Sequence, residues 1–205
     1  MDRLYYINLD KRKDRLEHLE KNVLPFINIP TESLQRVSAV DHTQFEHISQ
    51  RGAGCSLSHI NIWKDAINNG YKKIIIMEDD FELIGDKNKI NIVLDKLRTI
   101  KFSICNLGYN NLSPLRQTKN KGFYRCNNIQ TTSCYVADVE FLKVMLPHIE
   151  QATDKLMRCE PYVYNAIDQA WKVFQNREDW IVSERVGRQR GSVSDIERRN
   201  TNYGV

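Results

Sequence analysis

The chain has 205 residues, of which 41% are apolar and 27% charged, so it can bury a hydrophobic core and is not mainly disordered. Its formal net charge of +4 suits an anionic ligand such as a nucleotide and argues against the strongly basic surface of a nucleic-acid-binding protein. No apolar stretch approaches the roughly 20 residues that a membrane-spanning helix requires.

Strand-like apolar runs alternate with helix-like patterns over the first 108 residues. In chain order, we expect a strand over 4–9, a helix over 11–22, a strand over 34–40, a polar loop over 41–54, a helix over 56–67, a strand over 73–77, a helix over 86–99 and a strand over 102–107. Ser56 or Ser58 would cap the helix that follows the loop. This alternation predicts a doubly wound α/β sheet, in which ligands bind beyond the carboxyl ends of the strands.

The pattern changes after Gly108. We expect a polar loop over 110–120, strands over 122–126 and 133–137, helices over 139–149 and 162–175, and a polar, arginine-rich tail over 183–205. No internal repeat is visible, so we expect one domain.

Three adjacent acids, Glu78, Asp79 and Asp80, follow the apolar run that ends at Met77. Carboxylates at the end of a buried strand repel one another unless a cation lies between them. Magnesium and manganese prefer carboxylate oxygens and, when bound to a diphosphate, reduce the charge repulsion that opposes departure of a phosphorylated leaving group. The alternative is that these acids cap a helix or face solvent.

Other candidates are weaker when taken alone. Gly52 and Gly54 precede His59 and would let backbone N–H groups approach a phosphate at a helix start, although the G-K-S/T ending of a P-loop is missing. His59 could equally be a structural histidine, and Asp168, the one acid in the segment 162–171, could be structural too. The C-terminal arginines could clamp a diphosphate or form a solvated tail: 185, 188, 190, 198 and 199.

Several segments in the same order resemble glycosyltransferase family 25, which includes lipooligosaccharide glycosyltransferases and collagen hydroxylysine galactosyltransferases. Residues 7–15 are similar to the family's opening I-N-L-x-x-R-x-x-R, and 37–41 to its next strand. Residues 54–63 resemble the specific block G-C-x-x-S-H-x-x-x-W, and 78–80 its E-D-D form of the D-x-D signature. Weaker blocks match at 107–108, 132–135, 167–168 and 194–196.

The resemblance implies a GT-A fold, with a Rossmann-like, mostly parallel central sheet and helices on both faces. It also implies a UDP-sugar donor and Mn²⁺, with Mg²⁺ as the alternative ion. Asp80 would be the principal metal ligand, Glu78 a ribose or metal contact, and Asp79 an orienting neighbour. Inversion at the anomeric carbon needs a base for the acceptor hydroxyl, and Asp168 is the candidate.

The residues expected to bind the nucleotide sugar come from the first half of the chain: Asn8, Leu9, Arg15, Asp41, Ser58, His59, Glu78 and Asp79. Within one GT-A domain over 1–205, residues 1–108 would form this half, 109–182 the acceptor side and 183–205 a basic tail. Either the tail adds oxygen ligands such as Ser194 or Asp195, or Glu78, Asp80, diphosphate and water hold the metal.

These expectations favour a metal-dependent inverting enzyme that moves a hexose, with galactose favoured, to a hydroxyl of a glycan, glycolipid or hydroxylysine. The alternative is a catalytically silent accessory subunit that binds a nucleotide sugar. No nucleic-acid partner and no transmembrane segment are expected. The five cysteines show no C-x-x-C pair and the first residues show no signal-peptide pattern, so we expect a cytoplasmic protein with reduced thiols.

Overall fold

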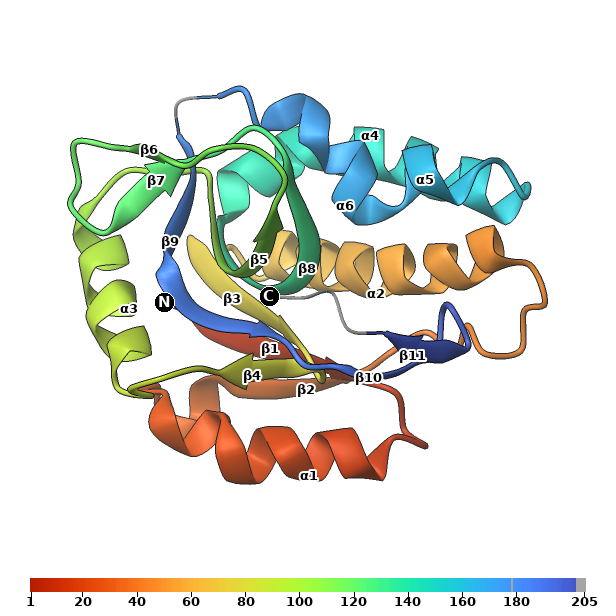
Figure 1. The fold of residues 1–205 in the computed structure, drawn as a ribbon, viewed down its shortest axis with the longest axis horizontal. Helices are drawn as coiled ribbons and strands as arrows, with labels where there is room; N and C mark the ends of the chain where they lie inside the picture. The colour runs from red at the N-terminus through yellow and green to blue at the C-terminus, as the bar shows by residue number, and fades with distance from the viewer. Residues whose placement is uncertain (178, 202–205) are drawn as a thin grey trace.

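The computed structural model describes residues 1–177 and 179–201 (Figure 1). The strands are β1 Arg3–Asn8, β2 Leu34–Ser38, β3 Lys73–Glu78, β4 Phe81–Leu83, β5 Ile104–Asn111, β6 Arg116–Gln117, β7 Phe123–Arg125, β8 Ile129–Asp138, β9 Trp180–Gln189, β10 Ser192–Ser194 and β11 Arg199–Thr201. The α-helices are α1 Lys13–Asn22, α2 Ile48–Asn68, α3 Lys89–Thr99, α4 Val139–Met157, α5 Tyr162–Asn165 and α6 Ile167–Ala170. Three 3-10 helices are η1 Leu24–Phe26, η2 Thr31–Ser33 and η3 Trp171–Phe174.

Nine of the described strands form one sheet in the order β2-β1-β3-β8-β5-β9-β7-β6, with β4 paired to β9, and β10 and β11 form a separate hairpin. β1 is parallel to both β2 and β3, and β5 is parallel to β9. β8 runs antiparallel between β3 and β5, so β1, β2, β3, β5 and β9 all point the same way. The predicted α/β fold with a mostly parallel sheet is therefore confirmed.

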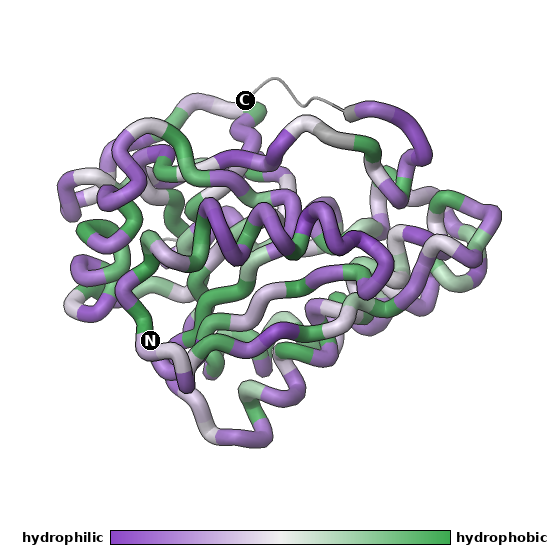
Figure 2. Tube along the Cα trace, turned by 90° about the horizontal axis from the view of Figure 1, so that it is seen from below, coloured by the Kyte–Doolittle hydropathy of each residue, from purple (hydrophilic) through white to green (hydrophobic). Residues whose placement is uncertain are grey.

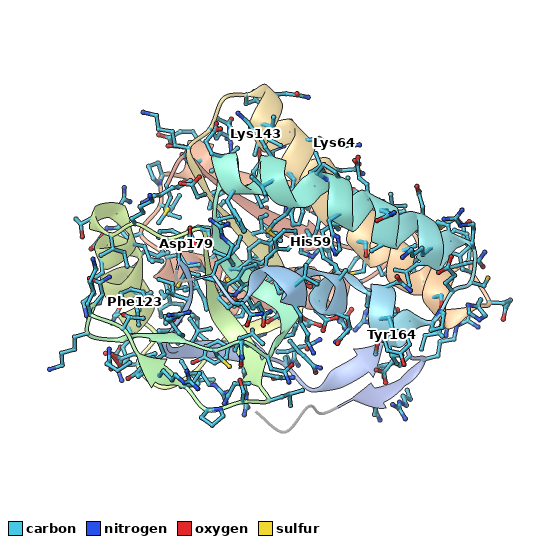
Figure 3. The ribbon with its side chains drawn as sticks, turned by 90° about the horizontal axis from the view of Figure 1, so that it is seen from above. His59, Lys64, Phe123, Lys143, Tyr164 and Asp179 are labelled. Atoms are coloured by element: carbon cyan, nitrogen blue, oxygen red, sulfur yellow. The ribbon has the colours of Figure 1, made fainter. Side chains whose placement is uncertain are left out.

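Helices cover both faces of this sheet, as predicted (Figure 1). On one face, α2, α4 and α6 pack over a core that includes the fully buried Trp63, Trp171 and Trp180. On the other face, α1 and α3 contribute residues such as Leu19 and Leu97. α1, which lies nearest the viewer in Figure 2, is largely hydrophilic. Leu19 is its buried residue, and most of its other side chains face solvent. Lys64 of α2 and Lys143 of α4 lie at the outer surface in Figure 3, whereas His59 points inward.

The helix α2 begins earlier than the sequence indicated. It starts at Ile48 with His47 as its N-cap, so much of the predicted loop over 41–54 is helical and the prediction that Ser56 or Ser58 caps the helix is wrong. Both hydroxyls instead bond to carbonyls one turn back within the helix. The backbone N–H groups of Gly52 and Gly54 therefore do not stand at a helix start, and the predicted phosphate cradle there is wrong.

The two glycines serve close packing. A Cβ at Gly52 would lie 2.5 Å from the ring of Tyr162, and one at Gly54 would lie 2.2 Å from Cβ of His42. Both distances are shorter than any real Cβ contact, so larger side chains would push these neighbours away. The glycines bring α2 close to the segments that hold Tyr162 and His42.

The region after residue 139 also differs from the prediction. α4 continues through Pro147 to Met157, because buried positions such as Ala152 and Leu156 extend its apolar face. The predicted helix over 162–175 is divided into α5, α6 and η3, because Ala166 has an extended backbone with ψ 146°. This break turns the start of α6 toward the sheet.

The segment predicted as a basic tail is partly a central strand. β9 pairs with β5, β7 and β4, and its Ser183 and Val186 are buried, so the prediction that a polar tail begins at residue 183 is wrong. The apolar residues of β9 face the core, while Arg185 and Arg188 bond to Asn111 and Glu82. Arg198 and Arg199 pair with Glu46 and Glu197. These four arginines, for which a diphosphate clamp and a solvated tail were the alternatives, therefore have partners within the protein.

No helix among the described residues has the length and apolar character needed to cross a bilayer.

Candidate functional site

A cavity of about 270 Å³ lies where β1 and β3 end. Its lining includes nine of the ten residues that the sequence indicated for the site or its immediate surroundings: Asn8, Leu9, Arg15, Ser58, His59, Glu78, Asp79, Asp80 and Asp168. Asp41 is outside this lining. Its exposed carboxylate accepts hydrogen bonds from the backbone N–H and the hydroxyl of Thr43, so its contact with the nucleotide stays a prediction that this lining does not support.

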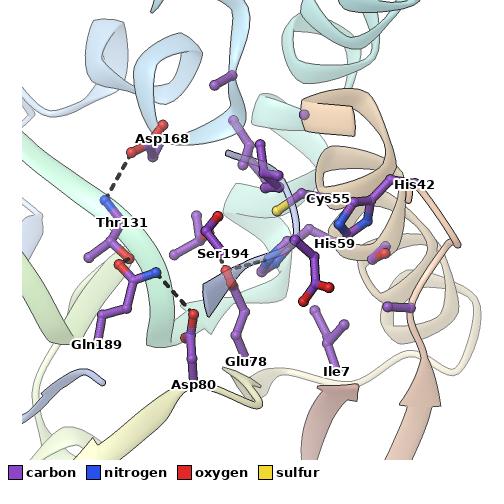
Figure 4. A pocket seen from close by; sticks show the side chains of 18 of the residues that line it. Ile7, His42, Cys55, His59, Glu78, Asp80, Thr131, Asp168, Gln189 and Ser194 are labelled. Atoms are coloured by element: carbon purple, nitrogen blue, oxygen red, sulfur yellow. Dashed lines mark hydrogen bonds and ion pairs between the residues drawn. The ribbon is translucent and has the colours of Figure 1, made fainter. Parts of the chain in front are cut away.

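Glu78 is held by a chain of hydrogen bonds that starts in the core. The indole N–H of Trp63 donates to the hydroxyl of Tyr135 over 2.9 Å, and that hydroxyl lies 2.9 Å from Nδ1 of His59. An indole only donates and a phenol has one hydrogen, so Tyr135 donates to Nδ1 and Nε2–H donates to Glu78 over 3.1 Å (Figure 4). The sequence block 54–63 thus holds one carboxylate of the acid cluster in place.

Thr132 donates a further hydrogen bond to the same oxygen of Glu78. Burial by itself would raise the pKa of Glu78, but the hydrogen bonds from His59 and Thr132, with the charge of Arg15, outweigh burial and lower the pKa. Glu78 is therefore an ionised carboxylate at neutral pH.

Asp79 is committed to groups of the protein. Its two oxygens accept from the guanidinium of Arg15 at 2.9 Å and from the side-chain amide of Asn8 at 2.7 Å. Burial raises the pKa of Asp79 in spite of the nearby charge of Arg15. Asp79 therefore fits the predicted role of an orienting neighbour, because neither oxygen is left without a partner.

Asp80 differs from its neighbours because one oxygen is unsatisfied. Gln189 donates to Oδ2 over 3.0 Å, whereas Oδ1 is buried and has no hydrogen-bond partner among the described residues. Burial first, and then the negative charge of Glu78, raise the pKa of Asp80 to about 7. A buried carboxylate oxygen without a donor is costly, and a hard divalent cation beside Glu78 would satisfy it. The donor set therefore fits Mn²⁺ or Mg²⁺.

Asp168 lies across the cavity from the acid cluster, at the start of α6 (Figure 4). The backbone N–H of Thr131 donates to Oδ2 over 3.1 Å, and Gln169 donates to Oδ1. Burial raises the pKa of this carboxyl, although these hydrogen bonds oppose the rise. The carboxyl thus has a higher proton affinity than an ordinary aspartate, as a general base requires.

Thr131 and Gln189 connect the two aspartates. The Thr131 hydroxyl donates to Oε1 of Gln189 over 3.0 Å, and the amide of Gln189 donates to Asp80. Thr131 has φ of 69°, which is rare for a β-branched residue and costs on the order of 1–3 kcal/mol. Thr131 adjoins the family block at 132–135, whereas Gln189 stood in the supposed tail and carried no sequence signal.

His42 also lines the cavity, although no sequence pattern indicated it. Its Nδ1–H donates to the carbonyl of Val40, and its buried Nε2 has no partner among the described residues. Burial lowers the pKa of His42, which favours the neutral ring. Its position directly after Asp41 in a supposed loop gave no reason to choose it.

The hairpin β10–β11 closes one side of the cavity. The lining includes the connecting segment: Ser194, Asp195, Ile196 and Glu197. Arg12 pairs with Asp195 at 2.5 Å, and Arg51 donates to the carbonyl of Ile196 at 2.5 Å. Asp195 is therefore engaged with Arg12, and the hydroxyl oxygen of Ser194 accepts a hydrogen bond from the backbone N–H of Glu197 over 3.1 Å, so both predicted tail ligands already have partners within the protein.

The mostly parallel sheet and the carboxylate-lined cavity at its strand ends define the class of GT-A proteins. The fold is similar to that of a glycosyltransferase involved in the glycosylation of the major capsid of PBCV-1, with a TM-score of 0.55 and 11% identity over 95% of each chain. It is also similar to mannose-1-phosphate geranyltransferase from Thermus thermophilus, with a TM-score of 0.51 and 11% identity over 96% of this chain and 76% of that one. At this identity the likeness shows the fold alone.

The family follows from the sequence itself. The sequence profile of glycosyltransferase family 25 (LPS biosynthesis protein) matches residues 1–184, so the chain belongs to this family and is a glycosyltransferase. The match ends within β9, before Gln189 and the hairpin that closes the cavity.

Proposed function

We propose that this protein is an inverting, metal-dependent glycosyltransferase that moves a hexose from a UDP-sugar to a hydroxyl of a glycan, glycolipid or hydroxylysine. Galactose is the favoured sugar because the family resemblance includes galactosyltransferases. The observation that carries the proposal is that Oδ1 of Asp80, beside the ionised Glu78, is buried without a hydrogen-bond partner in the described part of the chain, with Asp168 across the same cavity.

Asp80 and Glu78 would hold Mn²⁺ or Mg²⁺, which when bound neutralises the diphosphate of the leaving group. Arg15 and Asn8 keep Asp79 engaged, so its charge does not compete for that ion. Asn8, Leu9, Ser58 and His59 line the wall on which the nucleotide would lie.

Asp168 would act on the acceptor. As the acceptor oxygen forms a bond to the anomeric carbon, the bond from that carbon to the diphosphate oxygen breaks and UDP leaves. The proton of the acceptor hydroxyl passes to the Asp168 carboxylate, which Thr131 and Gln169 hold in position. Attack on the face opposite the leaving group inverts the anomeric centre.

A screen of UDP-sugars with and without Mn²⁺ tests donor and metal together. We expect the melting temperature to rise when both are added and slow release of UDP to be detectable. Asp80→Asn and Asp168→Asn should each abolish transfer, and only Asp80→Asn should remove the dependence of UDP binding on Mn²⁺. Asp95→Asn, an exposed carboxylate on α3, is the matched control and should retain full activity.

Two results would change the assignment. UDP-sugar binding without transfer to any acceptor would support the silent accessory subunit. Full transfer by Asp168→Asn would show that another group takes the proton. The five unpaired cysteines also lead us to propose a reducing, cytoplasmic compartment.

A further inference from the structure

A second cluster of metal-ligating groups lies in the same cavity and uses different chemistry. Sγ of Cys55, a ring nitrogen of His59 and a carboxylate oxygen of Glu78 all lie within 4.8 Å of one another. Cys55 and His59 are four residues apart on α2, so they share the helix face that meets the end of β3. In Figure 4 both side chains point from α2 into the cavity, near Glu78.

This donor set differs from the hard oxygen set at Asp80. A thiolate and an imidazole favour zinc and related thiophilic ions, whereas Mn²⁺ and Mg²⁺ prefer carboxylate oxygens. Nε2 of His59 and Oε1 of Glu78 are 3.1 Å apart. Two ligands on one tetrahedral zinc, each bonded at about 2.0 Å, are separated by roughly 3.3 Å. His59 and Glu78 thus stand close to the spacing that such an ion needs.

The surroundings of His59 support a role as a ligand. A metal-bound imidazole usually donates its other N–H to an oxygen, which fixes the ring. Nδ1 of His59 faces the Tyr135 hydroxyl at 2.9 Å, so the ring proton can move to Nδ1 and leave the lone pair of Nε2 for the ion. Tyr135 then loses the acceptor for its own hydrogen, which weakens the site relative to a dedicated structural zinc centre.

The charges near the cluster also favour a cation. Glu78 belongs to the cluster itself, and Asp80 and Asp168 line the same cavity, so a cation bound there lies among acidic side chains. Cys55 is partly exposed and lines the cavity, so an ion can reach it, whereas Cys105 and Cys134 are buried in the opposite face of the sheet.

We propose that Cys55, His59 and Glu78 form a binding site for a thiophilic divalent cation such as Zn²⁺, which shares Glu78 with the proposed Mn²⁺ or Mg²⁺ site but uses a thiolate and an imidazole in place of Asp80. Binding releases the thiol proton of Cys55 to solvent as the metal–sulfur bond forms. The bound ion uses Glu78, so it inhibits glycosyl transfer. The inhibition rests on the proposed function, whereas the binding does not.

The test is a titration of the metal-free full chain with Cd²⁺, kept reduced with a phosphine. In the wild type, we expect the ultraviolet charge-transfer band of a cadmium thiolate to grow until one equivalent of Cd²⁺ has been added. Cys55→Ser should lose this band, and Cys159→Ser, which removes an exposed thiol far along the chain, should keep it. Calorimetry with Zn²⁺ should show binding at least about 10-fold weaker in Cys55→Ser and Glu78→Gln.

A second measurement needs no variant of the site. In the wild type, Zn²⁺ should slow alkylation of Cys55 by iodoacetamide, mapped by mass spectrometry, without protecting Cys159. Equal Zn²⁺ affinity in the wild type and Cys55→Ser, or equal alkylation of Cys55 with and without Zn²⁺, overturns the proposal. Mn²⁺-dependent binding of a UDP-sugar, measured on the same samples, shows whether such a failure extends to the proposed function.

Discussion

Asp80→Asn should make the apo protein more stable at alkaline pH while it abolishes glycosyl transfer. Burial and the charge of Glu78 raise the pKa of Asp80 from 3.8 to about 7 in the folded state. The folded protein therefore holds a proton that the unfolded chain releases, so stability falls as the pH rises between these two values. The penalty is absent below about pH 4 and complete above about pH 7.

The size of this effect follows from the pKa. A rise from 3.8 to about 7 corresponds to a penalty of roughly 4 kcal/mol on the free energy of unfolding. Asn cannot ionise, so it removes the penalty, and the favourable contacts of the carboxylate with Gln189 and Arg15 are already included in this pKa. A gain of about 4 kcal/mol at alkaline pH would raise Tm by roughly 8–16 °C for a chain of this length.

The assay is thermal and urea unfolding of the wild type and Asp80→Asn in EDTA, from about pH 4 to about pH 8. The difference in stability should be near zero at the acid end and grow toward the alkaline end. Asp95→Asn should change stability by less than about 0.5 kcal/mol at every pH. If Asp80→Asn is less stable than the wild type at pH 8, or if the gain does not depend on pH, the environment assigned to Asp80 is wrong.

Three further predictions concern the groups around the acids. Gln189→Leu should lower the rate of transfer and weaken Mn²⁺ binding about 10-fold, because Asp80 loses its amide donor; Gln151→Leu on the exposed face of α4 should have no effect on transfer or on Mn²⁺ calorimetry. Gly54→Ala should destabilise the protein by about 1–3 kcal/mol in urea unfolding although alanine favours helices, because its Cβ meets His42; a gain in stability would contradict the packing. Tyr135→Phe should cost about 1–3 kcal/mol, since Trp63 and His59 lose their shared partner, and unchanged unfolding would disprove the hydrogen-bond chain.

The sequence indicated the fold and much of the cavity because those features depend on local pattern. β1 and β3 are apolar runs with polar residues at their carboxyl ends, and a parallel sheet places such ends at one edge. The acid cluster after β3 and the block at 54–63 belong to the same edge, so their position in the site could be expected.

Local pattern failed where close packing or a distant partner decides the structure. Gly52 and Gly54 were interpreted as a loop because glycine is uncommon inside helices, yet they lie within α2, where Tyr162 and His42 approach the backbone. The arginines of β9 led to the prediction of a polar tail, whereas the apolar residues of this strand face the core. Asp41 has the composition of a site residue, but its side chain turns to Thr43.

By itself, then, the sequence determined that three acids end a buried strand near a histidine and that an aspartate later in the chain belongs to the same family pattern. Only the tertiary structure decided how they differ. Arg15 and Asn8 occupy both oxygens of Asp79, His59 holds Glu78, and one oxygen of Asp80 is buried with no donor among residues 1–177 and 179–201. These differences arise from contacts such as Gln189 with Asp80, 109 residues apart, which no local periodicity encodes.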